Sequence, residues 1–207
     1  MIEKRVWYGI DNFLAEGYFL PASEKYCLNE KSDSGKSELT VAVSGDNLCS
    51  EDYDHKGKCN FLKENSSFKL GKSVDHILLQ KKHQGWILHL IEMKSQVDNK
   101  RWHEIRQKTR ASYFNACALE RVLGIHIDSV KVYTTYERTR FTDISVTTDP
   151  KTFVIPLGKP IVPIPKTDWE SNLISVDVGE FVKFEHEAVK MERSEDGTKL
   201  VGKLQIE

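Results

Sequence analysis

The chain has 207 residues, of which 39% are hydrophobic and 29% charged, a composition that excludes a disordered or fibrous chain. No apolar run approaches the roughly 20 residues that span a bilayer, and the first residues lack the apolar stretch and cleavage site of a secretory signal. Four scattered cysteines, at positions 27, 49, 59 and 117, favour reduced thiols over a disulfide framework. We therefore expect a cytoplasmic protein without a membrane partner.

Charge is balanced overall but not locally. The formal net charge is −1, so the whole chain does not have the excess positive charge of many nucleic-acid binders. Residues 94–110, however, carry six basic side chains against Asp98 and Glu104. One basic segment in a balanced chain suits an anionic ligand bound at one place. A solvated helix face is the alternative explanation of the same charges.

The first third of the chain is predicted to be a helix followed by a long loop. Apolar residues from Trp7 to Tyr18 recur at helical spacing, which predicts helical structure within 5–30. Residues 29–67 are rich in polar side chains and glycine, so a long loop or insertion is expected there. One short strand is predicted inside it, at 39–43.

The middle of the chain predicts a hairpin, a helix and another strand. Strands are expected at 73–80 and 85–94. The clearest helix is 99–123, which Asp98 or Asn99 can cap and Gly124 can end, and a strand follows at 125–134.

The last quarter of the chain changes character. Prolines interrupt an extended stretch up to residue 165, and an Asp-Gly turn at 195–198 is expected to join strands at 181–191 and 199–206. These patterns predict an α/β fold, with a mixed central sheet flanked by helices in a core of residues 1–150. Residues 151–207 are expected to form a β-rich C-terminal extension.

The hairpin brings three charged residues together. With His83 and Gln84 at the centre of the turn, Asp75 lies directly opposite Glu92, and such cross-strand neighbours have Cβ atoms about 5 Å apart. Lys94 follows Glu92 on the same face at roughly 7 Å along the strand. A register shifted by two residues would instead pair Asp75 with Lys94 as an ordinary ion pair.

This convergence indicates a metal site. Residues 86–93 are apolar on both faces, which is typical of a covered strand, and two carboxylates facing each other there repel and are costly to desolvate. A divalent cation removes both penalties, and Mg²⁺ commonly takes one or two carboxylates together with substrate phosphate and water. Lys94 could then orient or deprotonate the attacking water.

The same residues resemble a known family. A strand with Val74-Asp75, a short turn, and an apolar strand that ends in Glu92-Met93-Lys94 and leads into a helix is similar to the PD-(D/E)xK nuclease superfamily, in its restriction-endonuclease-like and RecB-like branches. With the following helix and strand, the resemblance spans residues 71–134. Val74 replaces the usual proline.

The resemblance implies roles for particular residues. Asp75, Glu92 and the Met93 carbonyl would bind Mg²⁺ or Mn²⁺, and Lys94 would be the catalytic lysine. The first helix of this family often supplies another acidic ligand, for which Glu24 and Glu16 are candidates; an ordinary surface glutamate is the alternative for each. A homodimer is also implied, because double-strand cutters often pair two active sites.

The helix after the lysine is the predicted nucleic-acid contact. Its candidate residues are Arg101, Arg106, Gln107, Lys108 and Arg110. RecB-like members carry a glutamine and a tyrosine close together on this helix, whereas Gln107 and Tyr113 are six positions apart and do not share a face.

The sequence thus predicts a Mg²⁺-dependent nuclease that hydrolyses phosphodiester bonds in DNA, in the manner of restriction, defence or repair enzymes. One alternative is a catalytically inactive protein of the same fold that binds nucleic acid or a protein partner. Another is a β-rich interaction module in which the hairpin acids are surface charges.

Overall fold

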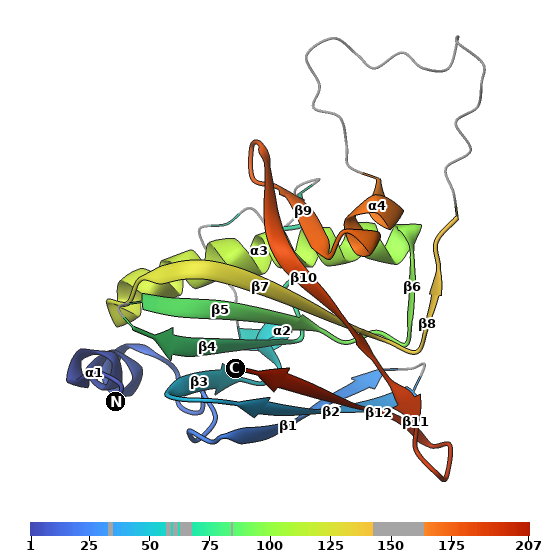
Figure 1. Cartoon of the computed structure of the whole chain (residues 1–207). Helices are drawn as coiled ribbons and strands as arrows, with labels where there is room; N and C mark the ends of the chain where they lie inside the picture. The colour runs from blue at the N-terminus through green and yellow to red at the C-terminus, as the bar shows by residue number, and fades with distance from the viewer. Residues whose placement is uncertain (33–34, 57–58, 60–61, 63–67, 84, 143–163) are drawn as a thin grey trace.

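Two β-sheets and a long helix make up most of the molecule (Figure 1). The computed structural model describes residues 1–32, 35–56, 59, 62, 68–83, 85–142 and 164–207. Within these ranges no helix combines the length and the apolar character needed to cross a membrane. The predicted α/β class with mixed sheets is confirmed.

The large sheet has six strands in the described part of the chain. In spatial order they are β3 (Asn47–Ser50), β4 (His76–Lys82), β5 (Gly85–Glu92), β7 (Ile127–Tyr136), β10 (Phe181–Lys190) and β9 (Leu173–Asp177). The β3–β4, β4–β5 and β10–β9 pairs are antiparallel, whereas β5–β7 and β7–β10 are parallel. Both faces of β4 and β5 are buried in apolar clusters, which explains the continuous apolar runs of these strands.

The hairpin formed by β4 and β5 has the predicted register. His76 pairs with Ile91, and Lys82 pairs with Gly85 at the turn. The next position outward along this register sets Asp75 opposite Glu92. The predicted turn residue Gln84 lies outside the described residues. The side chains of Ile77, Leu79, Leu88 and Leu90 share the face of Asp75 and Glu92, because side chains alternate along a strand.

Helix α3 (Asn99–Leu123) covers this face of the large sheet, as predicted (Figure 1). Asp98 caps its start by accepting a hydrogen bond from the Arg101 amide at 2.8 Å. Gly124 ends it in the left-handed conformation, with φ 65°. A shorter helix, α1 (Lys4–Phe13), packs against α3. The predicted helical region 5–30 therefore ends much earlier than expected.

A second sheet covers the opposite face. Its strands, in spatial order, are β1 (Lys25–Ser32), β2 (Gly35–Val43), β12 (Lys199–Ile206) and β11 (Glu192–Arg193). Buried residues of this sheet, among them Leu28, Leu39 and Val41, pack in one cluster with Ile91 and Met93 of the large sheet's second face. Helices were predicted to flank the central sheet, whereas they cover one face and a sheet covers the other.

Within residues 29–67 the strand predicted at 39–43 is confirmed as part of β2, but the loop predicted around it is wrong where that range is described. The range contains the second half of β1, all of β2 and β3, and the short helix α2 (Tyr53–Lys56). The burial of β2 alternates from Leu39 to Val43, because one face packs on the large sheet and the other faces solvent. Polar residues such as Lys36, Ser37, Glu38 and Thr40 interrupt the apolar positions of β2, which is why composition alone indicated a loop around residues 39–43.

The C-terminal region is rich in strands, as expected, but it is built into both sheets. Strands β9 and β10 extend the large sheet, β12 lies between β2 and β11, and β10 leads directly into β11 (Figure 1). Across the turn at 194–198, β12 pairs with the two residues of β11 rather than with β10. Parallel partners distant in sequence leave no local signal, so the sequence pattern suggested an extension. The predicted boundary at residue 150 lies outside the described residues.

Three small elements complete the frame around the hairpin. Strand β6 (Gln96–Asp98) pairs in parallel with β8 (Arg138–Arg140), and the short helix α4 (Pro165–Glu170) packs against α3 and β9. Strands β6 and β8 follow β5 and β7, respectively. They therefore lie beyond the end of the large sheet at which Glu92 is placed.

Replacing Leu39 by alanine tests whether this part of the chain is packed strand. Leu39 is fully buried between the sheets, so Leu39→Ala is expected to lower the free energy of unfolding by about 2–5 kcal/mol, measured by urea denaturation. The exposed Val122 on α3 supplies the matched control, Val122→Ala, with a change within about 0.5 kcal/mol. Equally small effects of both substitutions would contradict the placement of Leu39 in a strand packed between the two sheets.

Candidate active site

Two buried carboxylates meet at one end of the β4–β5 hairpin. Asp75 lies immediately before β4 and is 3% exposed, while Glu92 is the last residue of β5 and is 0% exposed. Lys108, from the middle of α3, reaches both. Its Nζ lies 2.9 Å from Asp75 Oδ1 and 2.8 Å from Glu92 Oε1. An ammonium group therefore lies between the two acids.

Lys94 joins the same cluster from the residues after β5. Its Nζ is 2.5 Å from Glu92 Oε1 and 3.8 Å from Asp75 Oδ2, and it donates to the Met93 carbonyl at 2.9 Å. The Lys94 amide donates to Thr135 Oγ1 at 2.9 Å, which ties this segment to β7. The structure thus brings Asp75, Glu92 and Lys94 together, as the sequence predicted.

The hairpin itself orients the Asp75 carboxylate. The Met93 amide donates to Asp75 Oδ2 at 2.7 Å, so backbone from one strand holds the side chain of the other. A charge-assisted bond of this kind is short and directional. Asp75 consequently presents Oδ1 to Lys108, while Oδ2 lies against the Met93 amide on the side of Lys94.

Burial and charge act differently on the two acids. Burial disfavours the charged form of Asp75, but Lys94, Lys108 and the Met93 amide outweigh it and hold the pKa of Asp75 below its usual value. For Glu92, complete burial and the neighbouring Asp75 charge outweigh the lysines and raise its pKa. The Lys108 pKa is also raised, since Glu92 and Asp75 stabilise its charged form more than burial disfavours it. Asp75 is therefore the more readily ionised carboxylate of the pair.

A third acid approaches from the second sheet. Glu30, on β1, borders the same hollow as Lys94. Burial, reinforced by the Asp75 charge and opposed by Lys94, raises the pKa of Glu30 to about 7. The sequence did not single out this residue, because it falls where a loop was predicted. The missing information is that the strand predicted at 39–43 begins earlier, at residue 35, and pairs with residues 25–32 as a hairpin.

The predicted acidic ligand Glu24 lies elsewhere. It is exposed and lines a different hollow with Met1 and Asp46, which is not shared with Asp75 or Glu92. The reason is that residue 24 immediately precedes β1 instead of belonging to a helix. Glu30, six residues later on that strand, is the acid that lies within electrostatic range of Asp75.

Most of the predicted nucleic-acid contacts on α3 are buried. Arg106 Nη2 pairs with Asp168 Oδ2 at 2.5 Å, and Arg110 donates to the backbone carbonyls of Phe68 and Asp177. Gln107 is buried beside His103. These three side chains are largely withdrawn from solvent because α4 and β9 pack along this side of the helix, and they border a separate hollow away from Lys94.

Two of the predicted contacts remain close to the site. Arg101 is exposed at the start of α3, and Lys108 belongs to the acidic cluster rather than to the surface. The sequence missed Lys108 as a partner of both acids. Helical spacing marks which face of α3 is apolar, but not which polar residue on that face meets a carboxylate from the sheet.

The oxygen atoms at this site suit Mg²⁺ in kind. Two carboxylates and the Met93 carbonyl are hard ligands, and Mg²⁺ commonly uses one or two carboxylates with water and substrate for the rest. Among the described residues, no group of three or more His, Cys, Asp or Glu side chains could hold a metal ion. An ion between Asp75 and Glu92 would also have to displace the Lys108 ammonium. A cation placed here would therefore need water and substrate for most of its ligands.

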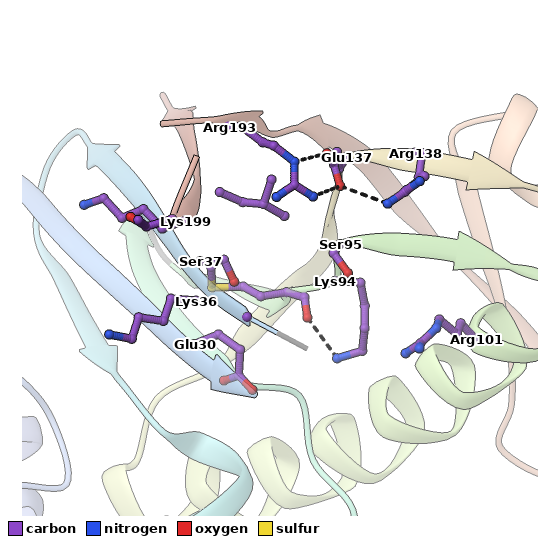
Figure 2. Close-up of a pocket in the computed structure, with 14 residues that line it drawn as sticks. Glu30, Lys36, Ser37, Lys94, Ser95, Arg101, Glu137, Arg138, Arg193 and Lys199 are labelled. Atoms are coloured by element: carbon purple, nitrogen blue, oxygen red, sulfur yellow. Dashed lines mark hydrogen bonds and ion pairs between the residues drawn. The ribbon is translucent and has the colours of Figure 1, made fainter. Parts of the chain in front are cut away.

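A hollow of about 360 Å³ opens beside Lys94 (Figure 2). Glu30 and Lys94 lie on facing sides of it, while Arg101 borders it from α3 and Lys36 from β2. Lys94 is 19% exposed and is therefore reachable from this space, whereas Glu92 behind it is sealed. The hollow gives a ligand access to the rim of the acidic cluster.

Comparisons with protein-family models, with curated proteins and with solved structures gave no match. The functional interpretation of the site therefore rests on the chemistry of Asp75, Glu92, Lys94 and Lys108 and on their placement.

Removing the Lys108 ammonium should destabilise the fold. Lys108→Met leaves two buried carboxylates with Lys94 alone, and we expect a loss of about 2–3 kcal/mol in EDTA, less than for a fully buried pair because the lysine retains some exposure. Lys100→Met, on the exposed side of the same helix, is the control. The double variant Lys108→Met/Glu92→Gln should recover part of the loss in urea denaturation. No difference between the two lysine variants would contradict the role of Lys108.

Glu30 should make stability depend on pH. Between the unfolded-state pKa of about 4.3 and the folded value of about 7, the folded chain holds a proton that the unfolded chain releases, so stability falls as pH rises through this window. Glu30→Gln removes this loss, and its melting temperature relative to the wild type should increase from pH 4.5 to 7.5. Glu24→Gln is the exposed control. A melting-temperature difference that is constant with pH would refute the assignment.

Proposed function

We propose that the chain is a Mg²⁺-dependent nuclease of the PD-(D/E)xK kind, with Asp75, Glu92 and Lys94 as its catalytic centre. The observation that carries the proposal is the pair of buried, facing carboxylates with Lys94 at 2.5 Å from Glu92. Such crowding is costly unless positive charge lies beside it, and a bound cation would supply that charge together with positions for water and phosphate. The location of the cluster, beside a basic hollow, suits an anionic substrate.

The arrangement of the elements supports the same proposal. Asp75 precedes β4, Glu92 ends β5, and the chain continues through α3 into β7, which is parallel to β5. This strand, turn, strand, helix and strand order in a mixed sheet is what the restriction-endonuclease-like resemblance implies. We therefore also propose that the core of the chain has a restriction-endonuclease-like fold.

Asp75, Glu92 and the Met93 carbonyl would hold the metal ion. Bound there, Mg²⁺ or Mn²⁺ would supply Lewis acidity toward a phosphate oxygen and a more acidic water. The protein's own part is to keep Asp75 ionised, which the Met93 amide and both lysines favour. It also keeps Glu92 away from bulk water, so the negative charge there is poorly screened.

Lys94 is placed to act on substrate. Its Nζ lies at the rim, in contact with Glu92 and with access to the hollow, whereas Lys108 lies deeper between the acids. From this position Lys94 can orient a water molecule toward a phosphate and offset charge that develops on the phosphate oxygens. Lys108 has a positioning role, because it contacts the carboxylates.

A second candidate function follows from Lys108. Its ammonium, with that of Lys94, already neutralises Asp75 and Glu92. A cluster balanced in this way is stable without a metal ion, which favours the alternative of a catalytically inactive protein that binds nucleic acid. The two candidates differ in one property, cleavage that requires Mg²⁺.

Cleavage assays distinguish the two candidates. Purified protein is incubated with plasmid, linear and single-stranded DNA and with RNA, in Mg²⁺, Mn²⁺ or EDTA. We expect metal-dependent cleavage that Glu92→Ala and Lys94→Ala each reduce by at least about 100-fold, since each removes a group that acts on the transition state.

The variants need a control for folding and for contaminating nucleases. Lys183→Ala, an exposed lysine on β10, should cleave like the wild type. Circular dichroism should show that Lys94→Ala remains folded. Cleavage that survives in Lys94→Ala, or that persists in EDTA, would reject the nuclease assignment. Binding without cleavage of any substrate would favour the inactive alternative.

A further inference from the structure

Most of the charged residues that line the hollow beside Lys94 are cations, and they come from several separate elements. Its basic residues are Lys36, Lys94, Arg101, Arg138, Arg193 and Lys199, against two acids, Glu30 and Glu137. Figure 2 shows Lys36 and Lys199 on the second sheet, Arg101 across the hollow on the helix, and Arg193 and Arg138 along a third side. We call these residues the basic groove.

Several of these cations are gathered at an energetic cost. Lys36 and Lys199 are directly paired positions on the parallel strands β2 and β12, and like charges opposite each other destabilise a sheet. Lys199 is held by Glu38 at 2.6 Å. Neither Lys36 nor Arg101 has an acidic partner among the described residues. An anion in the groove would remove this repulsion.

The two arginines on the third side are held in place. Glu137 accepts from Arg193 Nε at 2.7 Å and from Arg193 Nη2 at 3.0 Å, and it lies 3.7 Å from Arg138 Nη2. Both arginine side chains remain 54% exposed. A guanidinium has five N–H donors, so this bidentate pair fixes the orientation of Arg193 and leaves further donors for a phosphate.

The residues that line the groove also indicate which part of a nucleic acid they would contact. The described residues that line the groove include no aromatic side chain. Proteins that hold single strands usually stack bases on aromatic rings, whereas contacts to phosphates come from lysine, arginine and backbone amides. The groove therefore offers charged donors to phosphates and, among the described residues, no ring on which an unpaired base could stack.

We propose that the basic groove binds the phosphate backbone of a nucleic acid and directs it to Lys94, in place of the buried helix residues Arg106, Gln107 and Arg110. The inference rests on the proposed nuclease function for the identity of the ligand. It assigns binding to residues of β2, β8, β11 and β12, far in sequence from the catalytic motif. Recognition through phosphates makes the binding insensitive to base sequence and sensitive to salt.

A binding assay without cleavage tests the groove. Fluorescence anisotropy of a labelled duplex oligonucleotide is measured in EDTA at several salt concentrations. For Lys36→Ala/Arg101→Ala we expect about tenfold weaker binding or more, and a slope of log affinity against log salt that is shallower by about 2, because two phosphate contacts are lost. Two unrelated duplex sequences should bind with similar affinity.

The matched control is Lys203→Ala/Arg121→Ala. It removes the same charges from exposed positions on β12 and at the far end of α3, outside the groove, and should bind like the wild type. The proposal that the basic groove binds nucleic acid would be rejected by any of three results. These are equal weakening in both double variants, unchanged binding in the groove variant, and no binding by the wild type. Salt-dependent binding that requires the groove residues, without Mg²⁺-dependent cleavage, would support binding by the basic groove and reject the proposed nuclease activity.

Discussion

The buried pair of Asp75 and Glu92 is the constraint on which the rest of the site depends. Two carboxylates at facing positions of a covered hairpin cannot both be ionised without positive charge beside them. The chain supplies it from two directions, with Lys94 at 2.5 Å from Glu92 and Lys108 at 2.9 Å from Asp75. The position of α3 on the sheet is therefore tied to the hairpin by charge as well as by apolar packing.

The chemistry of the cluster depends on which positively charged group lies between Asp75 and Glu92. An ammonium and a metal ion meet the same electrostatic need, but only the ion binds water and phosphate as ligands. Competition between Lys108 and a cation for the space between the acids would set how tightly the cation is held. The proposed chemistry thus depends on a group that is not in the catalytic motif.

The parts of the structure that the sequence predicted are local ones. The hairpin register follows from the short turn at His83, and the bounds of α3 follow from Asp98 and Gly124. Asp75, Glu92 and Lys94 lie within twenty positions of one another, so a single hairpin suffices to bring them together.

The parts that the sequence did not predict depend on distant partners. Strand β2 pairs with β12 about 160 positions later, and Glu30 reaches the site only because that sheet packs on β5. Arg106 is basic in sequence but buried in space, since its partner Asp168 comes from another segment. No local periodicity records such pairings, and the same limit hid the basic groove.

The parallel pairing of β2 with β12 has a consequence for biosynthesis. During translation the segment that contains the hairpin and α3 emerges well before β12, so Asp75, Glu92, Lys94 and Lys108 can assemble while β2 still lacks its second neighbour. Until β12 arrives, β2 presents an unpaired edge of the kind that promotes association between nascent chains. The arrival of β12 would both close that edge and bring Lys199 to Lys36. A premature stop shortly before β12 would then leave an aggregation-prone product in which the acidic cluster can form but this side of the substrate path is missing.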